Sequence, residues 1–298
     1  MSDITLLDGS IGQEIMKRSG DKPTPLWSTR VMIDHPHLVD EVHLEYFNAG
    51  ATVATTNTYA VLRDRLRMVG IEDQMSLLTR NAVSSARQAR AAHGRGRVAG
   101  SIGPIGASYR PDLCPPPEQA AQIYAEHVDL MKNEVDLFLL ETMSSIEQAE
   151  GGLMATTGHG KPVWVGVTVD DDDGTKLRSG EALDDLRPVI ERYKPDAVLI
   201  NCSRPEAVTV SLDIVAGFGC PFGAYANGFT RISDGFLTVA PTVDHLTERT
   251  DLGPEAYATF AMTWVEKGAS IVGGCCEVGP EHIEELARAL QDAGHRIV

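Results

Sequence analysis

Short apolar runs of strand length alternate along the chain with longer amphipathic stretches. Eight runs rich in Val, Ile, Leu and Thr recur, and segments with apolar residues at helical spacing lie between most of them. The predicted strands are residues 4–8, 52–56, 97–102, 137–141, 163–169, 197–202, 223–226 and 270–274. Apolar strands that alternate with helices are typical of a parallel sheet whose faces are covered by helices.

The helices have recognisable start and stop signals. Ser144 and Glu147 have the spacing of a capping box, and Gly279 followed by proline marks the start of the last helix. Between a start at Gly253 and a stop at Gly268, one apolar stripe is formed by Tyr257, Phe260, Ala261, Trp264 and Val265. A further helix is predicted over residues 10–17.

Eight strand–helix units favour a closed barrel over a doubly wound open sheet. An open sheet of this kind usually carries a phosphate-binding loop after its first strand, but here Asp8-Gly9-Ser10-Ile11-Gly12 follows, which is neither a dinucleotide nor a nucleotide-triphosphate motif. No linker or repeat divides the chain. We therefore predict an α/β fold, a single-domain (β/α)₈ TIM barrel over residues 1–298.

Composition and charge narrow the partners. The formal net charge of −16 disfavours nucleic acid and anionic membranes, and we predict neither as a partner. The start of the chain lacks a signal-peptide pattern and no window of about 20 residues is apolar enough for a membrane span, so we expect a cytoplasmic protein. Five cysteines at irregular spacing favour thiol or metal chemistry over disulfides. A homo-oligomer remains open.

Polar and reactive residues gather at the carboxyl ends of the predicted strands, which form the catalytic face of a barrel. These residues are Asp8, Gly9, Asn57, Thr58, Tyr59, Glu141, Thr142, Asn201, Cys202, Tyr225, Asn227, Cys275 and Cys276. Six strand ends contribute, which makes chance a poor explanation.

Three of these residues predict a metal site. Cys202 ends the sixth strand and Cys275 and Cys276 end the eighth, so their sulfurs can meet at one height of the barrel. Neighbouring residues of a strand face opposite sides, and we expect Gly273-Gly274 to give the backbone freedom that lets both vicinal cysteines bind. Three soft thiolates with an open fourth position suit catalytic Zn²⁺. The alternative is a buried Cys202 beside an incidental or redox-active pair.

Such a site predicts chemistry on a thiol substrate. A metal-held thiol loses its proton at neutral pH, and its natural electrophile is a methyl group on a sulfonium or quaternary ammonium. Glu141 can pair with the ammonium of an amino-acid thiol, while the backbone amides around Gly9 and Ser10 can hold its carboxylate. Tyr59 and Tyr109 can face a cationic methyl donor.

Two other motifs are interpreted as structural. Residues 170–174 look like a calcium loop, but the spacing puts Val169 and Gly180 where calcium ligands are required. His35 and His37 flank a proline that suits a helix start, and we expect them to cap the helix or face solvent.

Over nearly its whole length the sequence resembles the homocysteine S-methyltransferases. The motifs that carry the resemblance are Leu6-Leu7-Asp8-Gly9, Thr56-Asn57-Thr58-Tyr59, Gly100-Ser101-Ile102-Gly103-Pro104, Leu140-Glu141-Thr142, Asn201-Cys202, Gly273-Gly274-Cys275-Cys276 and Pro280-Glu281-His282-Ile283. The resemblance implies a (β/α)₈ barrel, Zn²⁺ on the three cysteines and homocysteine bound through its thiol to the metal.

The resemblance also implies residue roles. Glu141 would bind the amino group and the Asp8-Gly9 turn the substrate, so Glu141 and Asp8 are the predicted catalytic residues. The predicted substrate-binding residues are Asp8, Gly9, Ser10, Asn57, Tyr59, Glu141 and Asn227. Asn227 or Tyr225 would fill the fourth zinc position when substrate is absent.

The sequence departs from the family pattern at two places near the donor. Glu277-Val278-Gly279 stands where many relatives have a small or basic residue and threonines, and Ala60 stands where larger polar residues are common. No cobalamin- or folate-binding domain is apparent, which favours a small donor. The resemblance implies methyl transfer from S-methylmethionine or S-adenosylmethionine to L-homocysteine, giving methionine. The alternatives are a thiol-dependent demethylase of a betaine or dimethylsulfonium osmolyte and a non-catalytic zinc-binding barrel.

Overall fold

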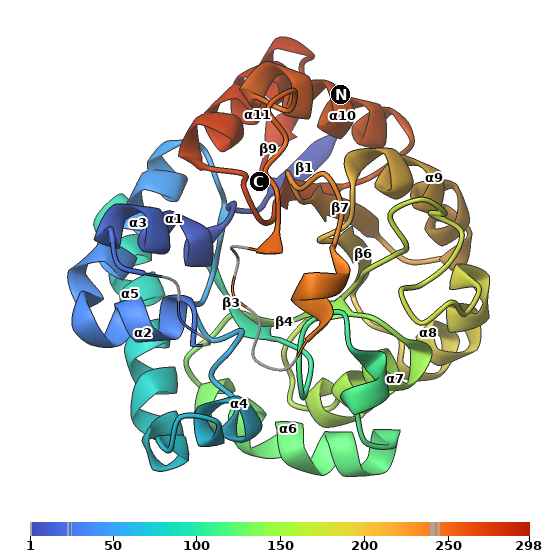
Figure 1. The fold of residues 1–298 in the computed structure, drawn as a ribbon. Helices are drawn as coiled ribbons and strands as arrows, with labels where there is room; N and C mark the ends of the chain where they lie inside the picture. The colour runs from blue at the N-terminus through green and yellow to red at the C-terminus, as the bar shows by residue number, and fades with distance from the viewer. Residues whose placement is uncertain (1, 23, 25, 239–241, 243–244) are drawn as a thin grey trace.

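The computed structural model describes residues 2–22, 24, 26–238, 242 and 245–298. Parallel strands form the centre of the molecule and helices form a ring around them (Figure 1). The strands are β1 (Asp3–Leu6), β2 (Val53–Thr55), β3 (Arg97–Ile102), β4 (Leu137–Met143), β5 (Val163–Val167), β6 (Ala197–Asn201), β7 (Phe222–Ala226), β8 (Ile271–Gly274) and β9 (Arg296–Ile297). The helices are α1 (Ile11–Ser19), α2 (Ser28–Asp34), α3 (Pro36–Asn48), α4 (Arg63–Arg67), α5 (Met75–His93), α6 (Pro117–Met131), α7 (Ile146–Thr156), α8 (Arg187–Tyr193), α9 (Pro205–Val215), α10 (Pro254–Glu266) and α11 (Pro280–Asp292).

The strands pair in the order β2-β3-β4-β5-β6-β7-β8-β1, and all of these pairs are parallel. A parallel bridge between Leu7 and Val53 brings the end of β1 beside β2. Next to it, the Thr52 N–H donates to the Leu6 carbonyl at 2.7 Å and the Asp8 N–H to the Val53 carbonyl at 3.1 Å. These contacts close the sheet, and the predicted (β/α)₈ barrel is confirmed.

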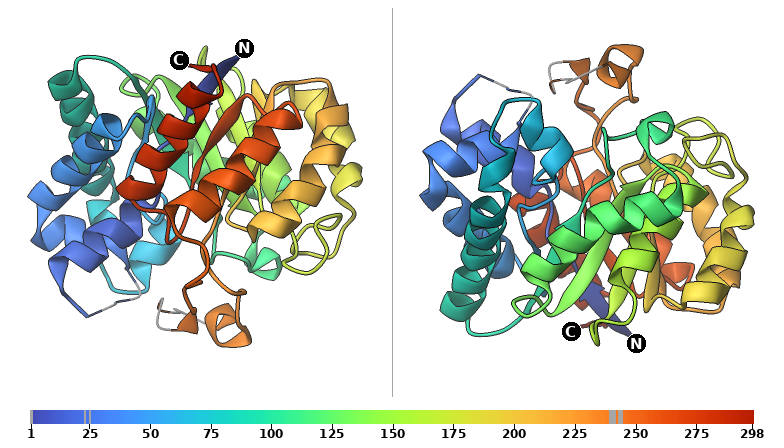
Figure 2. Two further views of the ribbon diagram at one scale, coloured as in Figure 1. Left: turned by 90° about the horizontal axis from the view of Figure 1, so that it is seen from above. Right: turned by 90° about the horizontal axis from the view of Figure 1, so that it is seen from below.

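Strand β9 is absent from the sequence prediction. It pairs with the start of β1, where Asp3 lies opposite Arg296, and the Arg296 guanidinium donates to the Asp3 carboxylate. A strand of two residues has no periodicity, so only its partner reveals it. Both termini therefore lie at one end of the barrel, opposite the segment that follows β7 (Figure 2).

The two faces of each strand pack into different cores. In β4, Phe138 and Leu140 pack against the helices, whereas Leu137 and Leu139 point into the barrel. Because side chains alternate along a strand, Glu141 continues the inward set and emerges at the carboxyl end of the barrel. Residues 137–140 are apolar at every position, so the sequence does not tell the two faces apart, and only the packing shows that Glu141 points inward.

Helix boundaries agree with the predicted signals except at one cap. Helix α10 buries Tyr257, Ala261 and Trp264, and α11 begins after Gly279. The cap of α7 is Ser145 rather than Ser144: the Ser145 Oγ accepts from the Gln148 N–H at 3.2 Å. The predicted pair with Glu147 is thus wrong by one residue: Gln148 is the partner, and its Oε1 accepts from the N–H of Ser144, the residue before the cap, at 2.7 Å.

Candidate metal and substrate site

The barrel holds a cavity of about 920 Å³, including its mouth, at the carboxyl ends of the strands. Its lining contains most of the residues predicted from the sequence: Asp8, Gly9, Ser10, Asn57, Tyr59, Tyr109, Glu141, Cys202, Tyr225, Cys275 and Cys276. Asn227 does not line it; this side chain is buried beside the cavity and its Oδ1 accepts from the Phe229 N–H at 3.1 Å. Its Nδ2 has no hydrogen-bond partner among the described residues, and the role of Asn227 as a substrate or zinc ligand stays a prediction.

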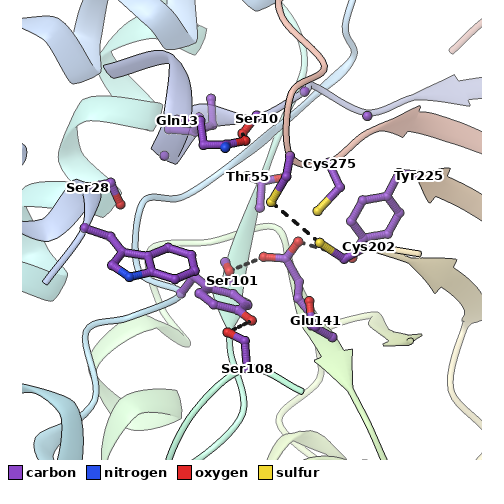
Figure 3. Close-up of a pocket in the computed structure, with 18 of the residues that line it drawn as sticks. Ser10, Gln13, Ser28, Thr55, Ser101, Ser108, Glu141, Cys202, Tyr225 and Cys275 are labelled. Atoms are coloured by element: carbon purple, nitrogen blue, oxygen red, sulfur yellow. Dashed lines mark hydrogen bonds between the residues drawn. The ribbon is translucent and has the colours of Figure 1, made fainter. Parts of the chain in front are cut away.

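Three thiols meet in the lining of this cavity (Figure 3). The sulfurs of Cys202, Cys275 and Cys276 all lie within 4.8 Å of one another, and Cys202 Sγ and Cys276 Sγ are 3.6 Å apart. Tetrahedral coordination at a Zn–S distance of about 2.3 Å separates sulfurs by roughly 3.8 Å. The donor set and its spacing therefore fit a zinc ion. Within the described residues this is the only group of three or more His, Cys, Asp or Glu close enough to share a metal.

Unusual backbone conformations hold the thiols in place. Cys202 has a φ of 49° and Glu277, directly after Cys276, a φ of 64°, values that residues other than glycine rarely adopt. The expected role of Gly273 and Gly274 is corrected here, because both lie in β8 and neither has a positive φ. They are glycines because of crowding: a Cβ at Gly274 would lie 2.1 Å from Val278 Cγ1, and one at Gly273 2.4 Å from Leu7 Cβ.

The three thiols change one another's pKa values. Hydrogen bonds from the Cys275 and Cys276 thiols and the Tyr109 hydroxyl lower the pKa of Cys202 well below its usual value, although burial raises it. The same contacts raise the pKa values of Cys275 and Cys276, because each then sits beside a thiolate. A cation among the sulfurs would release the remaining protons.

Tyr109 is the aromatic residue that reaches the thiols. Its hydroxyl donates to Cys202 Sγ at 3.0 Å. The fourth zinc position was expected for Asn227 or Tyr225 and not for Tyr109. The Arg178 guanidinium lies 5.0 Å from the centre of the Tyr109 ring and forms a two-point ion pair with Asp171 at 2.6 and 3.0 Å. One face of this ring is therefore already covered by a cation of the protein itself.

Tyr59, the other aromatic residue expected to face a cationic donor, has a similar environment. Arg65 lies 5.4 Å from the centre of its ring, and its hydroxyl shares a hydrogen bond of 2.7 Å with Ser108. The aromatic side chains that sequence reasoning missed are Trp27, Phe229 and Phe236, which also line the cavity. They come from loops without periodicity, and no local signal marks them.

Glu141 lies on the inner wall of the barrel between two hydroxyl donors. Ser101 Oγ donates to Glu141 Oε2, and the Tyr225 hydroxyl donates to Oε1 at 3.2 Å (Figure 3). Burial raises the pKa of Glu141 to about 7, against the lowering effect of the Ser101 bond, and the charge of Asp8 raises it further. Sequence reasoning missed Ser101, whose inward direction follows only once Ala99 is seen to point into the barrel.

Asp8 is a second buried carboxyl group at the rim. Its Oδ2 accepts from the Thr55 N–H at 2.6 Å and its Oδ1 from the Thr55 hydroxyl at 2.7 Å. Burial raises the pKa of Asp8 to about 7, while both bonds from Thr55 lower it. The side chain thus ties β1 to β2 in addition to facing the cavity.

The start of α1 departs from the predicted carboxylate site. The Ser10 N–H donates to the Val278 carbonyl at 2.9 Å, so this amide is already engaged. The Ser10 hydroxyl donates to Gln13 Oε1 at 3.1 Å. Gly12 and Gln13 are the second and third residues of α1 and line the cavity; their N–H groups have no acceptor within the helix. At this helix end the N–H groups without a helical acceptor are therefore those of Gly12 and Gln13, two and three residues after Ser10.

The remaining predicted residues have structural partners. Asn57 Oδ1 accepts from the Ser28 hydroxyl at 2.7 Å and so links the end of β2 to α2. His35 Nε2 lies 3.0 Å from Asp21 Oδ2, and the Asp170 carboxylate accepts from the Asp172 and Asp173 N–H groups within its own turn. No helix in the part of the chain that the structure describes combines the length and apolarity needed to cross a membrane.

The fold is a (β/α)₈ barrel, and its rim carries three thiols that could share a metal beside two buried carboxyl groups. This combination is typical of barrel enzymes. The sequence model of the homocysteine S-methyltransferase family matches residues 5–290, and the chain belongs to this family. The predicted resemblance is thereby confirmed.

Individual relatives agree with this assignment. The chain is 30% identical to the homocysteine S-methyltransferase of Escherichia coli (strain K12), over 95% of this chain and 94% of the relative. It is 25% identical to a selenocysteine Se-methyltransferase of Brassica oleracea var. italica, over 96% and 88% respectively. The crystal structure of the homocysteine methyltransferase MmuM from Escherichia coli in its metallated form superimposes with a TM-score of 0.79, at 28% identity over 96% of each chain.

Proposed function

We propose that this enzyme transfers a methyl group from a small sulfonium donor, S-methylmethionine or S-adenosylmethionine, to the thiol of L-homocysteine, and that Cys202, Cys275 and Cys276 hold a zinc ion. The observation that carries the proposal is the cluster of three sulfurs within 4.8 Å in the lining of a cavity that also contains Glu141. When bound, zinc would supply the positive charge that makes a substrate thiol available as thiolate at neutral pH.

The acceptor side of the cavity suits an amino acid. Glu141 is a hydrogen-bonded carboxylate inside the barrel, and an α-ammonium is the group that it would bind best. The free N–H groups at the start of α1 would hold an α-carboxylate through the positive end of the helix. These two groups lie on different strand ends, so they would orient the thiol of the substrate toward the cysteines.

The cavity as a whole also suits a cationic donor. Among the described residues that line the cavity, the charged side chains are Asp8 and Glu141, and both are acidic. Trp27, Tyr109 and Phe236 add aromatic surface, which attracts sulfonium and ammonium groups. Direct in-line displacement would then move the methyl group without a covalent enzyme intermediate, because both reactants are held in one cavity.

Metal analysis together with a methionine-formation assay tests the proposal. Reduced protein should contain about one zinc per chain, and Cys276→Ser should lose most of the metal and the activity, because a hydroxyl is a weaker ligand than a thiolate. The matched control is Cys220→Ser, since Cys220 lies outside the cluster. A Cys276→Ser protein that kept both zinc and activity would reject the assignment.

The donor is identified in the same assay. Homocysteine is combined in turn with S-methylmethionine, S-adenosylmethionine, glycine betaine and dimethylsulfoniopropionate. The proposal expects turnover with one or both of the first two. Turnover confined to betaine or dimethylsulfoniopropionate would instead assign the enzyme as a thiol-dependent demethylase.

A further inference from the structure

A side chain of helix α1 is hydrogen-bonded to the loop that carries Cys275 and Cys276. Gln13, in α1, accepts at Oε1 from the Glu277 N–H at 2.6 Å and donates from Nε2 to Glu277 Oε1 at 2.6 Å. The Glu277 side chain is 10% exposed and its second oxygen accepts from Lys17 Nζ at 2.6 Å. Backbone and side chain of the residue after Cys276 are thus both bound by one carboxamide.

The hydrogen bonds from Gln13 hold a residue whose backbone is strained. Glu277 has a φ of 64°, a left-handed conformation that residues other than glycine adopt only at a cost in free energy. On the other side of the loop, the Gly228 N–H donates to the Cys276 carbonyl at 2.8 Å. Because Cys275 and Cys276 lie directly before Glu277, the turn at Glu277 sets the direction in which both sulfurs leave the chain.

Gln13 also belongs to the cavity wall. Its side chain is 7% exposed, and its Oε1 accepts a second hydrogen bond from the Ser10 hydroxyl at 3.1 Å. One side chain therefore connects the start of α1, where the proposed substrate carboxylate would bind, to the loop that would bind metal. The two partners are 264 positions apart in the sequence.

We propose that Gln13 and Glu277 form a positioning pair that holds the Cys275–Cys276 loop in its metal-binding conformation. The proposal rests on the zinc site described above. Neither residue touches the reacting atoms; both act through the cysteines. Lys17 is a minor member of the network, because its own side chain is 53% exposed and exposed ion pairs contribute little.

Zinc affinity measured by competition with a chromogenic chelator tests the pair. Partners that orient metal ligands typically change affinity by about 10- to 100-fold when removed, and we expect a loss of this size for Gln13→Leu, which keeps the volume but makes no hydrogen bond. Gln13→Glu should lose at least as much, because two carboxylates would then face each other. Lys17→Met is the matched control on the same carboxylate and should change affinity by less than about threefold.

A double-substitution cycle separates positioning from general stability. Glu277→Ala should weaken zinc binding, and combining it with Gln13→Leu should add less than the sum of the single losses, because the two side chains act as one unit. The melting temperatures of the metal-free proteins are measured in parallel, and the positioning role predicts that they differ less than the zinc affinities do. Glu277→Ala reports on the same pair if a Gln13 variant fails to fold.

The outcomes distinguish this proposal from the zinc site itself. If the unchanged protein binds no zinc, the zinc site and the positioning role both fail. If the unchanged protein binds zinc and Gln13→Leu and Glu277→Ala bind it equally well, only the positioning role is rejected. Equal losses in Lys17→Met and Gln13→Leu would also reject it, since charge alone would then explain the effect.

Discussion

Glu141 and Asp8 are carboxyl groups whose burial raises each pKa to about 7. At pH 6 Glu141 is therefore mostly neutral and cannot pair fully with an ammonium group, whereas at pH 8 it is mostly ionised. The same burial has a consequence for stability. A folded pKa above the unfolded value stabilises the protein at low pH, and this contribution is lost as the pH rises through about 7.

Glu141→Gln tests the role of this carboxylate. The amide keeps the shape of the side chain but carries no charge, and hydrogen bonds to charged groups contribute about 1.5–3 kcal/mol, so we expect kcat/KM for homocysteine to fall by roughly 10- to 100-fold. In the unchanged enzyme kcat/KM should rise with pH through about 7. That rise should be smaller in Glu141→Gln, although Asp8 also titrates in this range. A variant with unchanged kcat/KM would show that the ammonium is bound elsewhere.

At the scale of the elements, strands β4 to β7 fit together through side chains inside the barrel. Asn201, at the end of β6, accepts from the Thr142 N–H at 2.9 Å and donates to the Thr142 hydroxyl at 3.0 Å. Between them Gly166 in β5 has no side chain, and this leaves room for the Tyr225 hydroxyl that binds Glu141. The glycine is thus required by close approach and not by a positive φ.

Gly166→Ala should disturb this arrangement. The new Cβ would lie 2.8 Å from the Tyr225 hydroxyl and 3.0 Å from Asn201 Oδ1, and overpacking of this kind costs about 1–3 kcal/mol. We expect a melting temperature lower by about 2–8 °C, measured by calorimetry, and a reduced kcat/KM. Tyr225→Phe removes the nearest atom, so the double variant Gly166→Ala/Tyr225→Phe should recover part of the stability. A double variant no more stable than Gly166→Ala would contradict the explanation.

At the scale of the whole molecule, four buried titrating groups act on stability in opposite directions. His43 and His127 are fully buried, their ring nitrogens lack partners among the described residues, and burial lowers the pKa of each to about 4. Their stabilising contribution is complete above an unfolded pKa of about 6.5 and is lost as the pH falls toward 4. Asp8 and Glu141 gain stability over the same window, so the net dependence on pH is expected to be shallow.

A histidine substitution separates these contributions. The His127→Gln variant lacks this imidazole and therefore does not lose its stabilising contribution at low pH. As the pH falls from 7 to 5, the free energy of unfolding of the variant minus that of the unchanged protein should increase by about 2 kcal/mol. Urea unfolding at both pH values measures the difference, and His37→Gln, on the exposed start of α3, is the control. Equal shifts in both variants would show that burial of His127 is not the cause.

The sequence alone determined the order of the strand–helix units and the position of Glu141 and three cysteines at strand ends. These features depend on local periodicity and chain order, which residues encode one after another. The Cys202–Cys276 contact at 3.6 Å agrees with the expectation that β6 and β8 would present their cysteines at one height.

Only the tertiary structure decided which loop residues complete the site. The Tyr109 hydroxyl donates to Cys202 Sγ, and the Ser10 N–H donates to the Val278 carbonyl. Gln13 is hydrogen-bonded to Glu277, 264 positions away in the sequence. Such contacts join irregular segments whose paths are fixed by packing, and irregular segments have no period from which side-chain direction can be inferred. The thiol cluster could therefore be predicted from the sequence, whereas the residues that position its cysteines could not.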